Sequence, residues 1–242
     1  MREIVLDTET TGLEPETGDR IVEIGAVELF NHVPTGRTYH QYINPERTMP
    51  QEAFDVHGLG ADLLESPPAP EEGNITLSDK PRFAEIGDTF LAFIGDAKLV
   101  IHNAAFDMKF LNAELGWMSR ALLPSDQAID TLAIARRKFP GSPASLDALC
   151  RRFGIDNSAR TRHGALLDSE ILAEVYLELI GGRQPGLVLS AGARNPVQNT
   201  DGTWRPAPRP APLPPRLTEE EAEAHRAFVA ALGPDAVWSK FG

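Results

Sequence analysis

The chain has 242 residues, of which 42% are hydrophobic, so it is long and apolar enough for one well-packed domain and a tail. Its 23 basic and 35 acidic residues give a net charge of −12, which excludes a protein that holds nucleic acid by overall charge alone. The one cysteine, Cys150, excludes an internal disulfide and a cysteine-based zinc site, and no apolar run reaches membrane-spanning length. We therefore expect a soluble, cytoplasmic protein that would need a partner to hold a nucleic-acid substrate.

The first predicted strand carries two acids. The apolar run over residues 4–6 leads into Asp7-Thr8-Glu9, and Thr10-Thr11-Gly12 then turns the chain. Side chains two residues apart on a strand point to the same side, so Asp7 and Glu9 can face one point. Two convergent carboxylates suit a hard divalent cation such as Mg²⁺. Taken alone, the triplet is explained more simply as a solvated turn.

The next segments predict a β-meander followed by alternating helices and strands. Strands are expected over residues 20–30 and 37–44, a short helix or turn over 51–58, and an exposed loop over 67–78. Apolar spacing then predicts helices over 82–94, 104–115, 131–139, 145–153 and 165–180, with strands at 99–101 and 128–129. This order predicts an α/β domain with a mixed sheet, and Asp130 is most simply a helix N-cap.

Two further acids stand where apolar residues are expected. Asp107 shares a helical stripe with Phe110 and Leu111, and Asp168 shares one with Ile171 and Leu172. An unpaired buried charge is very costly, so these acids need compensation. A helix cap would explain either one. Together with the first pair, a shared metal site is the better explanation.

A histidine precedes the last of these acids. His163 stands five residues before Asp168, at the start of the same predicted helix. A lone histidine is more often a surface or core residue. Next to four carboxylates it suggests phosphodiester hydrolysis, in which two metals activate a water molecule and imidazole takes its proton at neutral pH.

These residues form three motifs of a known family. Asp7-x-Glu9, His102-Asn103-Ala104-Ala105-Phe106-Asp107 and His163-x-x-x-x-Asp168 resemble the motifs of the DEDDh 3′→5′ exonucleases, which have an RNase H-like fold. Residues 100–107, 145–150 and 163–168 resemble most closely the proofreading subunits of bacterial replicative DNA polymerases. The resemblance covers residues 1–182, and the loop at 67–78 is longer than expected from it.

The resemblance implies a role for each motif residue. Asp7 bridges two cations, Mg²⁺ or Mn²⁺; Glu9 and Asp168 bind the one beside the attacking water, and Asp107 binds the other. His163 is the general base. The residues implied to contact the 3′-terminal nucleotide of DNA, through backbone or side-chain groups, are Thr10, Thr11, Gly12, Leu13, Glu52, His57 and Phe106. Core packing explains Phe106 equally well.

The tail has a different composition. Between Gly181 and Arg216 there are eight prolines and five glycines, which predicts an extended linker over residues 183–216. Gln184, Leu187 and Leu189 resemble a sliding-clamp-binding peptide. Residues 217–242 begin with a capping-box pattern at Thr218 and resemble the segment that docks on the polymerase (alpha) subunit. A small theta-like subunit is a further partner implied by the resemblance.

Three functions remain open at this point. The leading hypothesis is a metal-dependent proofreading exonuclease tethered to a replicative polymerase. The alternatives are a free-standing DEDDh nuclease acting on short RNA or DNA, and a structural subunit that braces polymerase and clamp with a silent site. The tail argues against the first alternative, and the complete set of four acids and His163 argues against the second.

Overall fold

The computed structural model of the protein describes residues 1–67, 73–182 and 217–233. The chain divides into two units, Met1–Val188 and Leu189–Gly242, which are described separately. Within the described ranges, no helix is long and apolar enough to cross a membrane.

The described part of the first unit contains five strands and six α-helices, and each predicted strand and helix is present, with ends that differ by up to four residues. The strands are β1 (Arg2–Thr10), β2 (Ile21–Phe30), β3 (Val33–Tyr42), β4 (Lys98–Ile101) and β5 (Ala128–Asp130). The helices are α1 (Gln51–His57), α2 (Phe83–Ile94), α3 (Ala104–Trp117), α4 (Thr131–Lys138), α5 (Leu146–Phe153) and α6 (Ala165–Ile180). Short 3₁₀ helices at Pro15–Thr17, Ala61–Leu63 and Ser125–Gln127 were not expected, because three residues are too few to show a periodic pattern.

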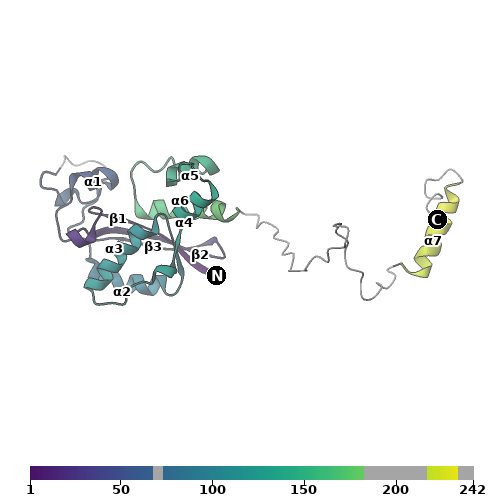
Figure 1. Cartoon of the computed structure of the whole chain (residues 1–242), viewed down its shortest axis with the longest axis horizontal. Coiled ribbons are helices and arrows are strands. Elements are labelled where there is room, and N and C mark those ends of the chain that lie inside the picture. The colour runs from purple at the N-terminus through teal and green to yellow at the C-terminus, as the bar shows by residue number, and fades with distance from the viewer. Residues whose placement is uncertain (68–72, 183–216, 234–242) are drawn as a thin grey trace, which may run out of the picture. The chain divides into compact units, whose positions relative to one another are not determined.

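The sheet is mixed, as predicted. Its strand order is β3-β2-β1-β4-β5, with antiparallel pairs in the meander and parallel pairs between β1, β4 and β5. Helices cover both faces of this sheet (Figure 1). Ile4 and Leu6 of β1 pack in the core that includes α2 and α3, whereas Val5 packs in the core that includes α4, α5 and α6. The alternation along β1 therefore assigns its odd-numbered side chains, including Asp7 and Glu9, to the α6 face.

Helix α6 lies unusually close to the sheet because β2 has a glycine at the crossing. A Cβ atom on Gly25 would overlap the backbone of Ala165 and Leu166. The Ser169 hydroxyl donates a hydrogen bond to the Gly25 carbonyl at 2.9 Å, which fixes the contact. Gly25 is paired with Asp7 across β1 and β2, so the close approach brings the start of α6 toward the acids of β1.

The expectation of an exposed loop over residues 67–78 is wrong for its second part. Leu77 is fully buried in a third core cluster with Val22 and Met49. The Asp62 carboxylate accepts hydrogen bonds from the backbone N–H groups of Leu77 and Ser78, at 3.0 and 3.1 Å. The polar composition of the segment as a whole concealed this short apolar anchor.

The described part of the second unit is one helix, α7 (Glu219–Ala231), and its predicted N-terminus is confirmed. The Thr218 hydroxyl accepts from the Glu221 N–H at 3.2 Å, and the Glu221 carboxylate accepts from the Thr218 N–H at 2.9 Å. The predicted linker (183–216) and the tail end with Trp238 and Phe241 lie outside the described residues.

Candidate active site

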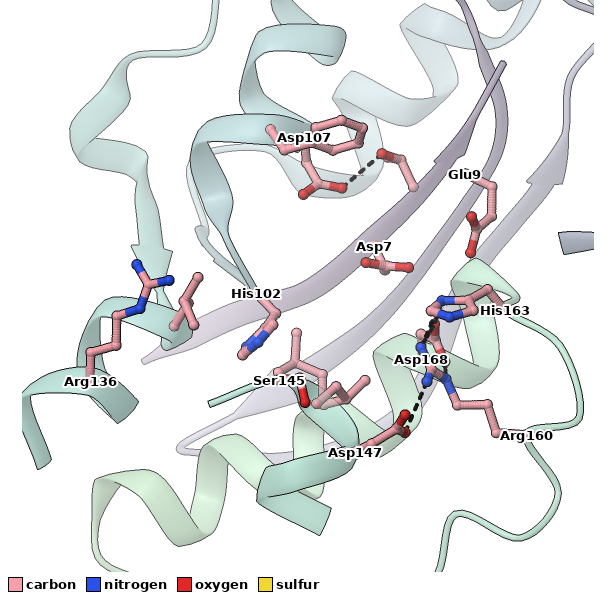
Figure 2. A pocket seen from close by; sticks show the side chains of 15 residues that line it. Asp7, Glu9, His102, Asp107, Arg136, Ser145, Asp147, Arg160, His163 and Asp168 are labelled. Atoms are coloured by element: carbon pink, nitrogen blue, oxygen red, sulfur yellow. Dashed lines mark hydrogen bonds and ion pairs between the residues drawn. The ribbon is translucent and has the colours of Figure 1, made fainter. Parts of the chain in front are cut away.

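A cavity of about 480 Å³ opens at the carboxyl ends of β1 and β4 (Figure 2). Its lining residues are Asp7, Thr8, Glu9, His102, Phe106, Asp107, Leu132, Arg136, Ser145, Leu146, Asp147, Arg160, His163, Asp168 and Leu172. All four predicted metal-binding acids and the predicted general base are in this set. Residues that are far apart in the sequence are therefore brought to one place.

The topology of the sheet explains this location. β1 and β4 are parallel neighbours, but the chain leaves β1 toward β2 and leaves β4 toward β5, on opposite sides. Such a divergence opens a crevice at the carboxyl ends of the strands. Asn103 has a left-handed backbone (φ 67°) between β4 and α3, which turns the chain so that Asp107 enters the crevice from the first turn of α3.

Asp7 and Glu9 face the cavity from β1 without a protein partner. Neither carboxylate takes part in a hydrogen bond or ion pair with another described residue. Burial, together with the charges of Asp107, Glu9 and Asp168, raises the pKa of Asp7 well above its usual range. Burial and the nearby Glu23 and Asp168 carboxylates raise the pKa of Glu9 to about 8. The charge of Arg160 opposes the rise of both pKa values but does not outweigh it.

Asp107 is buried at the start of α3 and has one neutral partner. The Thr8 hydroxyl, on the opposite face of β1 from Asp7, donates to its Oδ1 at 2.7 Å. Burial raises the pKa of Asp107 to about 7, although the Thr8 hydrogen bond opposes that rise. The predicted inward stripe is confirmed, since Phe110 and Leu111 are fully buried.

Asp168 differs from the other three acids because it has a cationic partner. Arg160 holds it with a bidentate interaction, in which Nη2 lies 2.7 Å from Oδ2 and Nε contacts Oδ1. Arg160 also donates through Nη1 to Asp147 at 2.9 Å, and its side chain is only 9% exposed. Burial alone would raise the pKa of Asp168, but hydrogen bonds from His163 and Arg160 outweigh it and lower the pKa. One acid of the cluster is therefore kept ionised by the protein itself.

His163 lies at the rim of the same cluster. Its backbone N–H donates to the Val56 carbonyl at 3.2 Å, and its half-exposed ring points toward Asp168. The Nδ1 atom is 2.8 Å from Nη2 of Arg160 and 3.4 Å from Oδ2 of Asp168. A protonated Nδ1 can donate only to Asp168, and an unprotonated one can accept only from Arg160. The proton position on the ring therefore depends on whether Nδ1 is hydrogen-bonded to Asp168 or to Arg160.

The residues of the cluster fit a divalent cation. One ligand atom each from Glu9, His163 and Asp168 lies within 4.8 Å of the others. Carboxylate oxygens are the ligands that Mg²⁺ and Mn²⁺ prefer, and buried acids with raised pKa values gain most from a nearby cation. Asp7 and Asp107 face the same cavity and add two more carboxylates of this kind.

The predicted nucleotide contacts are only partly brought to the cavity. Phe106 lines it and also packs against Phe110, with ring centroids 5.0 Å apart, so both explanations of Phe106 hold. His57 is buried, with Nε2 3.3 Å from the Thr10 carbonyl oxygen. The remaining predicted contacts are not lining residues: Thr10 and Thr11 are buried, Gly12 is half-buried, and Leu13 and Glu52 are exposed. Gln184, Leu187 and Leu189 lie outside the described residues.

Several lining residues had no predicted role. Arg160, Asp147 and Arg136 are the charged ones, and His102 and Ser145 belong to motifs quoted for the resemblance without a function of their own. A basic residue three positions before His163 gave the only available signal for Arg160. Its partners come from α5 and α6, so the sequence alone could not assign the contact.

A family model described as "Exonuclease" matches residues 4–176, which include all five clustered residues. The chain therefore belongs to the exonuclease family and is a 3′→5′ exonuclease. Exonucleases of the DEDDh type use divalent cations, in agreement with the carboxylate cluster.

Its relatives narrow the family further, to the DNA polymerase III epsilon subunits. The chain is 48% identical to the DNA polymerase III subunit epsilon of Rickettsia felis, over 96% of this chain and 97% of the relative. It is 42% identical to the subunit of the same name from Escherichia coli K12, over 98% of this chain and 97% of the relative.

Solved structures confirm the expected RNase H-like fold. Exonuclease X in complex with 5′ overhanging duplex DNA is 25% identical, with a TM-score of 0.51 over 73% of this chain and 90% of that chain. The nuclease domain of 3′hExo, a DEDDh family member bound to rAMP, is 19% identical, with a TM-score of 0.58 over 74% of this chain and 91% of that chain. The second likeness concerns the fold alone.

Proposed function

We propose that the protein is the proofreading exonuclease of a replicative DNA polymerase, removing mispaired deoxynucleotides from the 3′ end of DNA. The observation that carries the proposal is the convergence of Asp7, Glu9, Asp107, Asp168 and His163 on one cavity. The full-length similarity to proteins named DNA polymerase III subunit epsilon supports it.

The four carboxylates would hold two divalent cations, Mg²⁺ or Mn²⁺. When bound, such ions supply Lewis acidity for phosphodiester hydrolysis. Asp7, central in the cluster, would be shared between both positions; Glu9 and Asp168 would hold one and Asp107 the other. The raised pKa values of Asp7, Glu9 and Asp107 support this role, because these groups gain charge compensation when cations bind.

His163 would act as the general base. In that role Nδ1 carries the proton and donates it to Asp168, so that Nε2 is free to accept the proton of the attacking water. Nδ1 lies 3.4 Å from Oδ2 of Asp168 and 2.8 Å from Nη2 of Arg160, so this role requires the ring to turn from Arg160 toward Asp168. The half-exposed ring can reach a water molecule in the cavity.

The 3′-terminal nucleotide would lie beside the end of β1. Phe106 lines the cavity there, and the predicted contacts Thr10, Thr11, Gly12 and Leu13 directly follow Glu9. His57 adjoins this segment through Thr10, and α1 also carries Glu52. These residues would contact the sugar and base of the mispaired nucleotide.

The second unit would dock on the polymerase (alpha) subunit of DNA polymerase III. Apolar side chains are exposed on its capped helix α7 and just after it, with Phe228 62% and Leu232 51% exposed. Gln184, Leu187 and Leu189 are proposed to bind the sliding clamp, and a small theta-like subunit is a further proposed partner. A tethered nuclease gains effective concentration at the primer end, so the net charge of −12 does not prevent its action.

The test compares three substrates side by side: DNA with a mispaired 3′ end, fully paired DNA and short RNA. We expect release of deoxynucleoside monophosphates, fastest from the mispaired end, with Mg²⁺ or Mn²⁺ and none with a chelator. Preferential digestion of RNA would contradict the proposal. The chain truncated after residue 216 should keep the nuclease and lose polymerase binding, measured by gel filtration of the mixed subunits; unchanged binding would exclude the docking role.

A further inference from the structure

The active-site cavity has two ends of different charge. Glu9 and His163 lie on one side of Asp7, and His102 and Arg136 lie on the other (Figure 2). We call the second side the Arg136 end and define it by His102, Leu132 and Arg136, all lining residues. The four acids proposed to bind metal lie elsewhere in the cavity, so they do not explain why a positively charged side chain lines this end.

Arg136 is available for a ligand. Its guanidinium makes no hydrogen bond or ion pair with another described residue, and the side chain is exposed toward the cavity. Arg160, the other arginine of the lining, is by contrast fully engaged by Asp168, Asp147 and His163. Burial lowers the pKa of His102 and the charge of Arg136 adds to this, against a hydrogen bond with Ala144 and the charge of Asp130. Arg136 thus supplies the positive charge of this end.

The position of Arg136 relative to the catalytic acids is fixed. The Asp130 carboxylate accepts from the Asn103 N–H at 3.2 Å and from the Leu132 N–H at 2.9 Å, which joins the start of α4 to the start of α3. The Thr131 hydroxyl lies 2.9 Å from Nδ1 of His102 and donates to the Ile101 carbonyl at 3.2 Å. Helix α4 therefore holds Arg136 in register with the segment that carries Asp107.

We propose that Arg136 binds the phosphodiester immediately upstream, on the 5′ side, of the bond that is cut. This inference rests on the proposed function, which puts the terminal nucleotide beyond Glu9 and the scissile phosphate at the four acids. The remaining strand then leaves through the opposite side of Asp7, where Arg136 is a cationic lining residue that no other described residue engages. Arginine forms bidentate, charge-assisted hydrogen bonds with phosphate oxygens. Leu132 offers an apolar contact for the adjoining sugar.

Such a contact explains how an acidic protein can hold a second phosphate of the strand. The carboxylate side of the cavity repels phosphate unless cations are bound, whereas the Arg136 end attracts it. A strand entering with its 3′ end leading places a phosphate at each site. The subsite therefore requires a phosphodiester, and a free mononucleotide fills only one half of the cavity.

The test is a double-mutant cycle between the protein and the DNA. Single-stranded oligonucleotides carry either an ordinary linkage or an uncharged methylphosphonate at the position just upstream of the scissile bond, with a control methylphosphonate far upstream. The full-length wild type, Arg136→Gln, Arg136→Lys and Arg137→Gln are compared by kcat/KM with Mg²⁺. Arg137 is the matched control, because it is the next residue of α4, is exposed and does not line the cavity.

We expect the neutral upstream linkage to slow the wild type and Arg137→Gln about tenfold, the size of a charge-assisted hydrogen bond. Arg136→Gln should be slowed about tenfold on the ordinary substrate and show no further loss on the neutral one. Arg136→Lys should recover part of the sensitivity of kcat/KM to the neutral upstream linkage. Such a recovery would show that the loss in Arg136→Gln comes from the missing charge and not from a folding defect.

Full sensitivity to the neutral linkage in Arg136→Gln would overturn the inference, because a group other than Arg136 would then recognise that linkage. A wild type that is insensitive to the neutral linkage would also overturn it. A wild type that fails to digest the unmodified oligonucleotide would refute the proposed function itself, so the two failures are distinguishable.

Discussion

Two groups of buried acids in the first unit differ in what surrounds them. Glu114 on α3 is buried, but Arg20 holds it through Nε and Nη2, each at 2.8 Å. Glu23 on β2 is buried, but His40 lies 2.7 Å from one oxygen and the Ala165 N–H donates to the other at 3.1 Å. Asp7 and Glu9 are close by and have no such partner among the described residues.

The difference separates acids with a structural partner from two of the acids proposed to be catalytic. A buried carboxylate with a matched donor stabilises the fold, whereas one without a donor raises the free energy of the folded chain unless a ligand compensates it. Burial by itself does not distinguish the two. The absence of a protein partner among the described residues singles out Asp7 and Glu9, whereas Asp107 and Asp168 have partners and share only the cavity with them.

The largest effect is expected from Asp7→Asn. Removing the acid shared by both proposed cation positions should lower kcat by about a thousandfold, because the charge stabilisation of the transition state is lost. At the same time, the free energy of unfolding in a chelator should rise, since a repelling buried charge disappears. Single-turnover nuclease assays and urea titrations measure the two quantities. A variant that was both active and less stable would assign Asp7 to the structural group.

His163→Ala should lower kcat by about a hundredfold, the usual contribution of a positioned base. Activity should recover partly at alkaline pH, where hydroxide replaces the general base. The pH profile of single-turnover rates checks this. A variant whose pH profile parallels that of the wild type would argue against the role of His163 as the base.

Arg160→Ala should lower kcat about tenfold, as expected when a residue that orients a metal ligand is lost. Asp168 and His163 would then be held less firmly, although neither is removed. The matched control is Arg162→Ala, since Arg162 donates to Asn74 through Nη1 at 2.7 Å rather than to the acid cluster. Equal losses in the two variants would mean that Arg160 has no positioning role.

Glu114→Ala should change stability and leave the nuclease unaltered. Arg20 would lose its partner, and the free energy of unfolding should fall by about 2 kcal/mol, a moderate value because Arg20 keeps some contact with solvent. The denaturation midpoint in urea measures the change. A loss of activity at full occupancy of the folded state would place Glu114 in the catalytic group.

The last effect is a dependence of stability on pH, which changes no residue. In the folded chain the pKa of Glu9 is about 8 and that of Asp107 about 7, both above their ordinary values. The folded state then binds more protons than the unfolded one, so stability in a chelator should decline as the pH rises from about 5 to about 8. Added Mg²⁺ should reduce the decline. Urea midpoints across this range test it, and a rise with pH would contradict the raised pKa values.

The sequence predicted the fold well because its elements are locally encoded. The capping box at Thr218, the N-cap at Asp130 and the stripe beneath Asp107 are patterns within a few residues, and the structure has all three. The helical spacing of apolar residues also identified Asp107 and Asp168 as acids on faces that should be buried. Contacts that join distant segments were not predictable in this way.

Arg160 and Leu77 show the limit. Arg160 gains its role from Asp147 and Asp168, on two different helices, and no spacing along the chain encodes that meeting. Leu77 stands alone in a polar segment, where a single apolar residue gives no period. Long-range pairing and isolated anchors therefore required the three-dimensional structure.

The close crossing of α6 over Gly25 makes the geometry of the acid cluster depend on a residue that has no side chain. A single methyl added at that strand position would act as a spacer, lifting the helix that carries Asp168 away from Asp7. A genetic screen for raised mutation rates would then recover changes at Gly25 alongside those at the acids. In such a screen, changes that widen the spacing between β2 and α6 would raise the mutation rate as changes of the carboxylates do.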